Sequence, residues 1–263
     1  MIEEFKYFIL GLIQGITEFF PISSSGHIEL FKYVANVAHN DPVLLMITVH
    51  FATALSTIFV YQGRIKNIIR GIIIQYDKSA VSFCLKLLLS TIPIILTFIF
   101  LDSYIDNMFH NATVLVCIML VCTGLLLIST VFIKENQNEI NYKHAFFMGL
   151  AQAIAILPGI SRSGSTISTA IFFKIERKKA AEFSFLMGLA PIIGGAIFKM
   201  INYTTGVITI DEIRGLLIAF FTAFFSGLFA CRYMIKIVQN NSLHYFGFYC
   251  ILIGLGFLVF IIL

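Results

Sequence analysis

Residues 11–26 read GLIQGITEFFPISSSG, and residues 149–164 read GLAQAIAILPGISRSG. When one stretch is placed over the other with a shift of 138 positions and no gaps, eight of sixteen positions are identical. Each stretch begins as an apolar run with helical spacing and then breaks into a turn of proline, glycine and serine. The chain therefore contains an internal repeat, and each copy holds a broken helix.

The rest of the chain is apolar enough to lie in lipid. Of the 263 residues, 59% are hydrophobic and only 12% are charged, which is about half the charged share of a soluble domain. Six runs are close to the length of about 20 apolar residues that a helix needs to cross a bilayer. They are Leu44–Tyr61, Phe83–Leu101, Thr113–Ile133, Phe183–Ile201, Gly215–Tyr233 and Tyr245–Leu263. The sequence predicts a single all-α polytopic membrane domain over residues 1–263.

Two further segments, Phe5–Val37 and Ala145–Phe173, are apolar but interrupted by polar turns at residues 20–27 and 158–165. Broken backbone at membrane depth persists only where protein or a water-filled cavity satisfies its polar groups. Both segments are therefore predicted to be re-entrant helical hairpins, which enter and leave the bilayer on the same side.

The expected architecture is six transmembrane helices plus two re-entrant hairpins in an inverted-topology repeat. Each copy, at residues 1–135 and 143–263, holds one hairpin and three spans. Because three crossings is an odd number, the second copy begins on the opposite face of the membrane. Sites in inverted-repeat folds lie near the bilayer midplane where broken helices meet, so the two serine-rich tips are expected to meet there.

Lysine and arginine residues lie mainly on one side of this arrangement. Leaving out the hairpin breaks, the loops at 62–82, 134–182 and 234–244 hold eleven of them and the opposite side holds three. The positive-inside rule makes the richer side cytoplasmic, so both termini are expected to be external. The net charge of +4, with no basic run, argues against a nucleic-acid partner.

Arg162 is the strongest chemical signal in the two turns. It stands in the second turn where the first turn has Ser24. An ionisable residue deep in a membrane protein is costly and is by default a functional hypothesis. A guanidinium fork also suits phosphate better than a lysine ammonium does. We expect Arg162 to bind phosphate; the alternatives are a structural arginine paired with Glu18 and an arginine shallow enough to reach water.

Glu18 and His27 occur only in the first copy of the repeat. Glu18 is expected to bind a divalent cation, to position water or to hold His27; its alternative is a helix-end carboxylate that caps the turn. His27 is expected to transfer protons, and its alternative is a hydrogen-bonded interior histidine. Gln14 shares a helix face with Glu18. Because Gln152 matches Gln14 in the repeat, a packing or hydrogen-bonding role is as well founded for Gln14 as substrate binding.

The remaining residues of the turns are small or hydroxylated. They are Ser23, Ser24, Ser25, Gly26, Ser161, Ser163 and Gly164. Small residues let backbone N–H groups approach an anion, and a helix that starts just after them adds a positive dipole. These residues are expected to bind phosphate, and turn formation and helix capping are the alternative. The sequence does not separate a nucleophilic serine from a phosphate-binding one.

The two motifs resemble the signatures of the bacterial undecaprenyl-pyrophosphate phosphatase family, also called the bacitracin-resistance family. Its Ser-Ser-x-Gly-His falls on residues 23–27, and its Pro-Gly-x-Ser-Arg-Ser-Gly falls on residues 158–164. The resemblance extends to AAEFSFL at residues 180–186 and, in length and span count, to the whole chain. The family has Glu or Gln four residues before Glu18, and this chain has the less acidic option, Gln14.

The resemblance implies hydrolysis of undecaprenyl pyrophosphate to undecaprenyl phosphate and inorganic phosphate, which recycles the lipid carrier for cell-wall peptidoglycan synthesis and confers bacitracin resistance. It implies a polyprenyl pyrophosphate substrate, a divalent cation (Mg²⁺ or Ca²⁺), a bacterial plasma membrane location and a site that opens outward; it leaves a homodimer open. Glu18, Ser24, His27 and Arg162 become the expected catalytic residues, and Glu18 the expected metal ligand. Whether water, Ser24 or His27 attacks phosphorus stays open.

Transport is the competing class of function. A flippase or carrier for a phosphorylated lipid or anion can be built on the same inverted repeat. The other large membrane phosphatase superfamily also has a Ser-Gly-His, but its Lys…Arg-Pro and later Arg…His…Asp motifs are absent from this sequence. The hydrolase is therefore the preferred interpretation.

Overall fold

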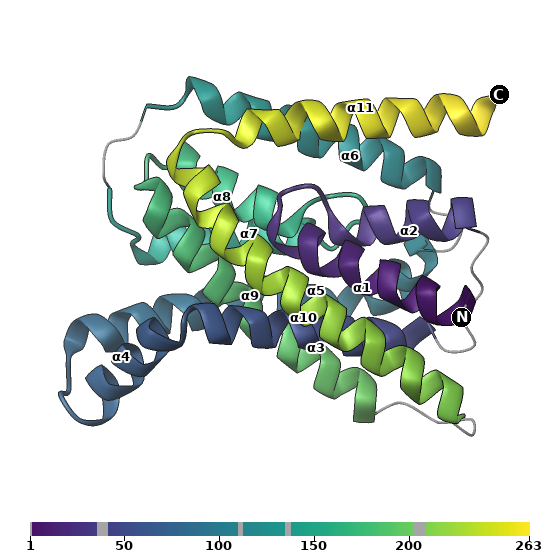
Figure 1. The fold of residues 1–263 in the computed structure, drawn as a ribbon. Coiled ribbons are helices and arrows are strands. Elements are labelled where there is room, and N and C mark those ends of the chain that lie inside the picture. The colour runs from purple at the N-terminus through teal and green to yellow at the C-terminus, as the bar shows by residue number, and fades with distance from the viewer. Residues whose placement is uncertain (1, 36–41, 110–112, 135–137, 202–208) are drawn as a thin grey trace.

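The computed structural model describes residues 2–35, 42–109, 113–134, 138–201 and 209–263. In these ranges every regular element is a helix and no strand is formed. Figure 1 shows the long helices side by side in a bundle, with both ends of the chain at the same end of it. The elements are α1 (Ile2–Phe19), α2 (Ser24–Ala35), α3 (Pro42–Val60), α4 (Gln62–Ile73), α5 (Lys78–Phe109), α6 (Thr113–Ser129), η1 (Thr130–Phe132), α7 (Tyr142–Ile154), α8 (Arg162–Phe172), α9 (Arg177–Ile201), α10 (Ile210–Gln239) and α11 (Leu243–Ile262).

Six of these helices are long and apolar enough to cross a membrane, namely α3, α5, α6, α9, α10 and α11. Each expected span falls on one of them, so the prediction of a multi-pass membrane protein is confirmed. Helices α5, α9 and α10 extend beyond the expected spans, because hydropathy marks only the lipid-embedded part of a helix. On α10, Phe221, Phe225 and Phe229 are each more than half exposed, as suits a surface that faces lipid.

The two broken segments form a helix, a turn and a second helix, as the sequence predicts. The turn between α1 and α2 covers residues 20–23, and the turn between α7 and α8 covers residues 155–161. Ser23 and Gly159 adopt positive φ angles of 70° and 97°. A positive φ reverses the chain within a few residues, and at position 159 glycine adopts it without steric cost.

Helices from the two halves of the chain pack against each other in matching pairs. α1 and α3 contact α10, α7 and α9 contact α5, and α6 contacts α11. Gly11 of α1 and Gly149 of α7 occupy the same position in the sequence repeat. A Cβ on Gly11 would overlap the carbonyl oxygen of Ala219 in α10, and a Cβ on Gly149 would overlap that of Ser90 in α5. The same close helix crossing, which needs a glycine, therefore occurs in both halves.

Helix α4 lies within residues 62–82, a stretch that the sequence analysis assigns to a loop. It follows α3 directly, lies beyond the body of the bundle and packs on the start of α5. In the described part of the second half, no such helix stands between α9 and α10.

Candidate active site

Each turn is closed by a serine that caps the following helix. Ser161 is the N-cap of α8, and its hydroxyl accepts a hydrogen bond from the Gly164 N–H at 3.1 Å. Ser23 does the same before α2: its hydroxyl accepts from the Gly26 N–H at 3.2 Å and its carbonyl oxygen from the His27 N–H at 3.1 Å. The capping alternative is therefore what these two hydroxyls do here, and their contact with substrate stays a prediction.

The two turns lie against each other, as the sequence predicts for the serine-rich tips. A Cβ on Gly26 would be 3.3 Å from the Cα of Gly159, and a Cβ on Gly164 would be 3.3 Å from the Cβ of Pro21. The first turns of α2 and α8 therefore start at one place in the protein. Their unpaired N–H groups and helix dipoles make this place attractive to an anion.

Glu18 is the centre of a hydrogen-bond network that joins the two turns. Its buried carboxylate accepts at Oε2 from Gln14 Nε2 at 2.9 Å and from Ser24 Oγ at 3.0 Å. At Oε1 it accepts from Nη2 of Arg162, in an ion pair between the end of α1 and the start of α8. Both oxygens are thus satisfied, as a buried charge requires.

The guanidinium of Arg162 has more donors than the protein uses. Nη2 donates to Glu18, and Nη1 donates to the carbonyl oxygen of Gly188 at 3.1 Å. These are its acceptors within the described ranges, whereas a guanidinium carries five N–H groups. The Arg162 side chain is 25% exposed and the Glu18 side chain only 6%. The pair therefore presents spare donors, and not its carboxylate, to an incoming oxyanion.

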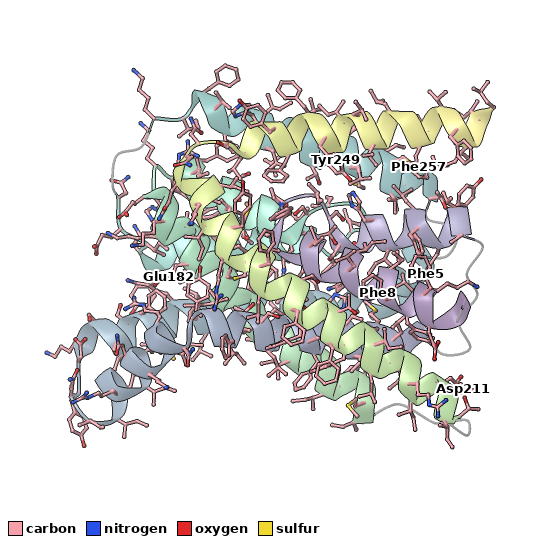
Figure 2. The ribbon with its side chains drawn as sticks, in the orientation of Figure 1. Phe5, Phe8, Glu182, Asp211, Tyr249 and Phe257 are labelled. Atoms are coloured by element: carbon pink, nitrogen blue, oxygen red, sulfur yellow. The ribbon has the colours of Figure 1, made fainter. Side chains whose placement is uncertain are left out.

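His27 has partners of its own. Its Nδ1 lies 2.8 Å from the carbonyl oxygen of Ser23, and its Nε2 lies 2.9 Å from the hydroxyl of Tyr249, whose ring stacks on the imidazole. Because a carbonyl oxygen only accepts, Nδ1 carries a proton and donates to Ser23; in the neutral imidazole Nε2 then accepts from the Tyr249 hydroxyl. Tyr249 lies on the side of α11 that faces the bundle (Figure 2). Of the three roles open to Glu18, holding His27 is therefore not the one that the structure shows.

Ser25 and Ser163 occupy equivalent positions two residues after the capping serines. Ser25 Oγ lies 3.4 Å from the hydroxyl of Ser23, and Ser163 Oγ lies 3.3 Å from that of Ser161. Ser163 also lies 3.5 Å from the carbonyl oxygen of Phe20, in the other turn. The serines thus form two similar clusters on either side of the place where the turns meet.

Three residues of the site lie outside the sequence motifs, namely Thr123, Gly188 and Tyr249. Thr123 on α6 braces the second turn, since its hydroxyl donates to the Gly159 carbonyl oxygen and accepts from the Ser161 N–H, both at 3.1 Å. Gly188 leaves room for the guanidinium, because a Cβ there would lie 2.6 Å from its Nη1. All three lie in apolar stretches far from either turn in sequence, so no local signal marks them.

Few side chains of the site could bind a metal ion. Within the described residues, no group of three His, Cys, Asp or Glu side chains is placed to hold one. Glu18 supplies a carboxylate, and Gln14 Oε1 beside it is buried without a hydrogen-bond partner. A buried amide oxygen without a donor, next to a carboxylate, fits a hard cation that takes its other ligands from water and phosphate, as Mg²⁺ does.

Known proteins resemble this chain over nearly its whole length. The family model for Bacitracin resistance protein BacA matches residues 7–256. A protein from Christiangramia forsetii, named undecaprenyl-diphosphatase, is 37% identical over 258 residues, 97% of each chain. A protein of the same name from Bacteroides fragilis is 38% identical over 255 residues, 96% of each chain. One from Methanococcus vannielii is 34% identical over 257 residues, 97% of this chain and 98% of its own.

Proposed function

The chain belongs to the bacitracin resistance protein family, and from this premise we propose that it is a membrane phosphatase that hydrolyses undecaprenyl pyrophosphate to undecaprenyl phosphate and inorganic phosphate. One observation links this reaction to the site where the two turns meet. The Arg162 fork, held by Glu18 and Gly188, lies where two helix N-termini meet, which suits a phosphate group. The reaction recycles the lipid carrier for cell-wall synthesis and supports resistance to bacitracin.

Charge stabilisation is the main task of the proposed site, because phosphoryl transfer depends on positioning and electrostatics. The spare donors of Arg162 and the first N–H groups of α2 and α8 bind the phosphoryl oxygens. Gly26 and Gly164 let the two turns pack closely enough to bring these N–H groups together, since neither carries a side chain. The serines of the two clusters hold the turns in place or bind the headgroup through their hydroxyls.

Nucleophilic attack falls to water, Ser24 or His27. Nε2 of His27 is engaged by Tyr249, whereas the Ser24 hydroxyl donates to Glu18 and keeps its lone pairs available. The proposal therefore assigns attack to Ser24 or to a water molecule beside it. In either case the attacking oxygen bonds to the terminal phosphorus, the bridging P–O bond breaks and undecaprenyl phosphate leaves; if Ser24 attacks, water then hydrolyses the phosphoserine to release inorganic phosphate. His27 accepts the proton of the attacking oxygen at Nε2, once the substrate displaces the Tyr249 hydroxyl from that nitrogen.

A divalent cation, Mg²⁺ or Ca²⁺, is part of the proposal. Glu18 and Gln14 Oε1 would hold it, as the orphaned amide oxygen suggests. When bound, it would supply positive charge that offsets the pyrophosphate. Gln14 then orients Glu18 through its amide N–H group and offers its oxygen to the cation.

The proposed architecture is an inverted-topology repeat of residues 1–135 and 143–263, with α1–α2 and α7–α8 as re-entrant hairpins. The matched packing of α1 on α10 and of α7 on α5 supports it. So does the odd number of spanning helices in each half, which are α3, α5 and α6 and then α9, α10 and α11. In a bacterial plasma membrane, the lysine and arginine distribution places both termini and the mouth of the site outside.

Topology is tested by labelling single cysteines in intact cells. With the five native cysteines replaced by serine, a cysteine in place of Asn107 is expected to react with an impermeant thiol reagent and one in place of Lys66 is not. The lysine and arginine distribution predicts that Asp102–Asn111 is external; α5 continues to Phe109, so Asn107 lies in its last turn, and residues 110 and 111 lie outside the described ranges. Labelling at position 66 and not at position 107 would show that the orientation is the opposite of the proposed one.

Gly188→Ala is expected to lower phosphate release by roughly one hundredfold. The new Cβ would lie 2.6 Å from Nη1 of Arg162 and displace the guanidinium, and a shift of about 1 Å at a catalytic group can cost that much. The matched control is Gly194→Ala on the same helix, where a Cβ would meet no atom within 4 Å. Equal activity of the two variants would show that the position of Arg162 is unimportant.

Tyr249→Phe is expected to lower kcat by about threefold to tenfold, the worth of one hydrogen bond, while the stacked ring keeps His27 in place. Tyr245→Phe serves as the control, because Tyr245 is on the same helix and its ring lies beside His244, away from the site. Turnover is measured with saturating substrate. Equal rates for both variants would show that the Tyr249 hydroxyl has no role in proton transfer by His27.

The function is tested by incubating the purified protein with undecaprenyl pyrophosphate and measuring inorganic phosphate, with and without a chelator. Phosphate release is expected, with loss on chelation and recovery with added Mg²⁺ or Ca²⁺. A folded protein that releases no phosphate with either cation would rule out the hydrolase. Movement of the intact lipid between leaflets by such a protein would establish the transporter instead.

A further inference from the structure

Helix α4 has no task in the proposed site and no counterpart in the described part of the second half of the chain. It begins directly after α3, lies beyond the body of the bundle (Figure 1) and contains Arg64, Lys66 and Arg70 but no acidic residue. Between these cations lie isoleucines, which is the composition of helices that rest on a membrane surface.

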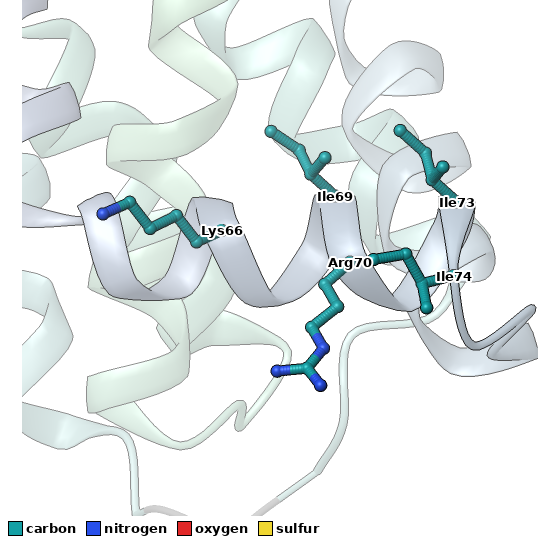
Figure 3. A pocket seen from close by; sticks show the side chains of 5 residues that line it. All are labelled: Lys66, Ile69, Arg70, Ile73 and Ile74. Atoms are coloured by element: carbon teal, nitrogen blue, oxygen red, sulfur yellow. The ribbon is translucent and has the colours of Figure 1, made fainter.

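One face of α4 is exposed and carries both kinds of side chain. Ile69, Ile73 and Ile74 are 50%, 64% and 66% exposed, and with Lys66 and Arg70 they line a shallow hollow of about 300 Å³. Figure 3 shows Ile69 and Ile73 pointing the same way, with Arg70 extended toward the other side of the helix and Lys66 directed back along it. Around the helix axis the two cations lie between Ile69 and Ile73 on one side and Ile74 on the other.

The two cations of this face are not neutralised by the protein. In the part of the chain that the structure describes, neither Lys66 nor Arg70 forms an ion pair. Arg64, by contrast, pairs with Glu182 of α9 at 2.7 Å and lies over the ring of Phe83 in α5 at 4.8 Å. One arginine therefore fastens the helix to the bundle, while the other two basic residues face outward.

The helix presents this face in a fixed orientation. A Cβ on Gly71 would lie 2.7 Å from the Cβ of Ala80, so α4 and α5 are in close contact there. The turn between them is closed by Asp77, whose carboxylate accepts from the N–H and the hydroxyl of Ser79 at 2.8 and 2.6 Å. These contacts use the buried face of α4 and leave the opposite face open.

The position of α4 in the chain places this face near the lipid headgroups. Phe59, at the end of the span Val43–Val60, is 48% exposed and marks the lipid-facing side of α3. α4 begins at Gln62, two residues after this span ends, and Tyr61 between them is not helical (φ −97°, ψ 15°), so α4 is a separate helix. A helix that leaves a span at such a break is free to run along the headgroup layer instead of away from it.

We propose that the exposed face of α4 is a binding surface for anionic phospholipids. Ile69, Ile73 and Ile74 lie at the boundary between headgroups and acyl chains, and Lys66 and Arg70 between them bind the phosphates of the lipids that cover this face. Two unpaired cations beside exposed isoleucines suit a partner that is anionic at one depth and apolar just below it. An anionic phospholipid has both properties.

The test is lipid binding to the purified full-length protein in neutral detergent, counted by native mass spectrometry during titration with phosphatidylglycerol or phosphatidylcholine. Wild-type protein is expected to retain phosphatidylglycerol in preference to phosphatidylcholine. Lys66→Gln with Arg70→Gln is expected to weaken the binding of at least one phosphatidylglycerol per chain by roughly tenfold to thirtyfold, the contribution of two basic residues at an anionic surface. Added salt is expected to reduce the difference.

The matched control is Lys143→Gln with Lys178→Gln, which removes two exposed charges that do not belong to α4 and is expected to leave phosphatidylglycerol binding unchanged. Equal losses in the two double variants, or no loss in the α4 variant, would overturn the proposal. So would a change from dimer to monomer at constant lipid per chain, which would make this face a protein contact. The readout is binding and not hydrolysis, so the result is independent of the proposed function.

Discussion

Arg162→Lys is expected to reduce phosphate release almost as severely as Arg162→Ala, by about 10²–10³-fold, the usual effect of removing a donor to a developing oxyanion. In the structure one arm of the guanidinium donates to Glu18 and the other to the carbonyl oxygen of Gly188, which leaves further N–H groups for phosphate. A lysine ammonium is a single point charge on a flexible stem. It cannot hold both anchors and still present a planar pair of donors.

The measurement is kcat/KM for undecaprenyl pyrophosphate, with thermal unfolding as the check on folding. Arg64→Lys is the matched control, because Arg64 also pairs with a glutamate, Glu182, but lies at the protein surface far from the two turns in sequence. Its activity is expected to stay within about twofold of wild type, as for a surface ion pair. Activity near that of wild type in Arg162→Lys would mean that charge alone suffices and that the fork has no role.

Losses at Glu18, His27 and Arg162 are expected to be strongly non-additive. Single replacements by alanine should each reduce phosphate release by at least about 10²-fold, and the three double variants should fall no lower than the worst single variant. Glu18→Ala frees Arg162 from its anchor, and Arg162→Ala leaves a buried carboxylate without its cation. His27 does not touch this pair, so its coupling to the other two must act through the bound substrate.

Double-mutant cycles on phosphate release measure this coupling. The pair Arg64 and Glu182 supplies the control cycle, in which each single change and the double change are expected to cost less than about threefold. Each variant is first checked by thermal unfolding, because breaking a buried ion pair also destabilises the fold. Independent, multiplicative losses at Glu18 and His27 would argue against one composite site and would favour the transporter interpretation.

The helices could be predicted wherever the residues that mark them are neighbours in the sequence. Each of the six spans is a continuous apolar run, and each broken helix is marked by its own proline, glycine and serine residues. Helix α4 was not predicted, because it is short and its three basic residues interrupt the apolar run. Only its packing on α5, through Gly71, shows that these residues form an ordered helix.

The sequence by itself determined which residue types the site contains. The repeat marks the two turns, and the exchange of Ser24 for Arg162 between its copies marks the place where they differ. Glu18 and His27 were recognisable for the same reason. An ionisable side chain in an apolar segment costs so much free energy that its presence is informative without any structure.

Only the tertiary structure decided how these residues are paired. Glu18 meets Arg162 across 144 positions of sequence, and His27 meets Tyr249 across 222. Tyr249 lies in an apolar run that reads as a membrane span, and the packing of α11 against the bundle is what turns its hydroxyl toward the imidazole. Hydropathy and turn chemistry depend on neighbours in the chain, whereas hydrogen bonds and close contacts depend on neighbours in space.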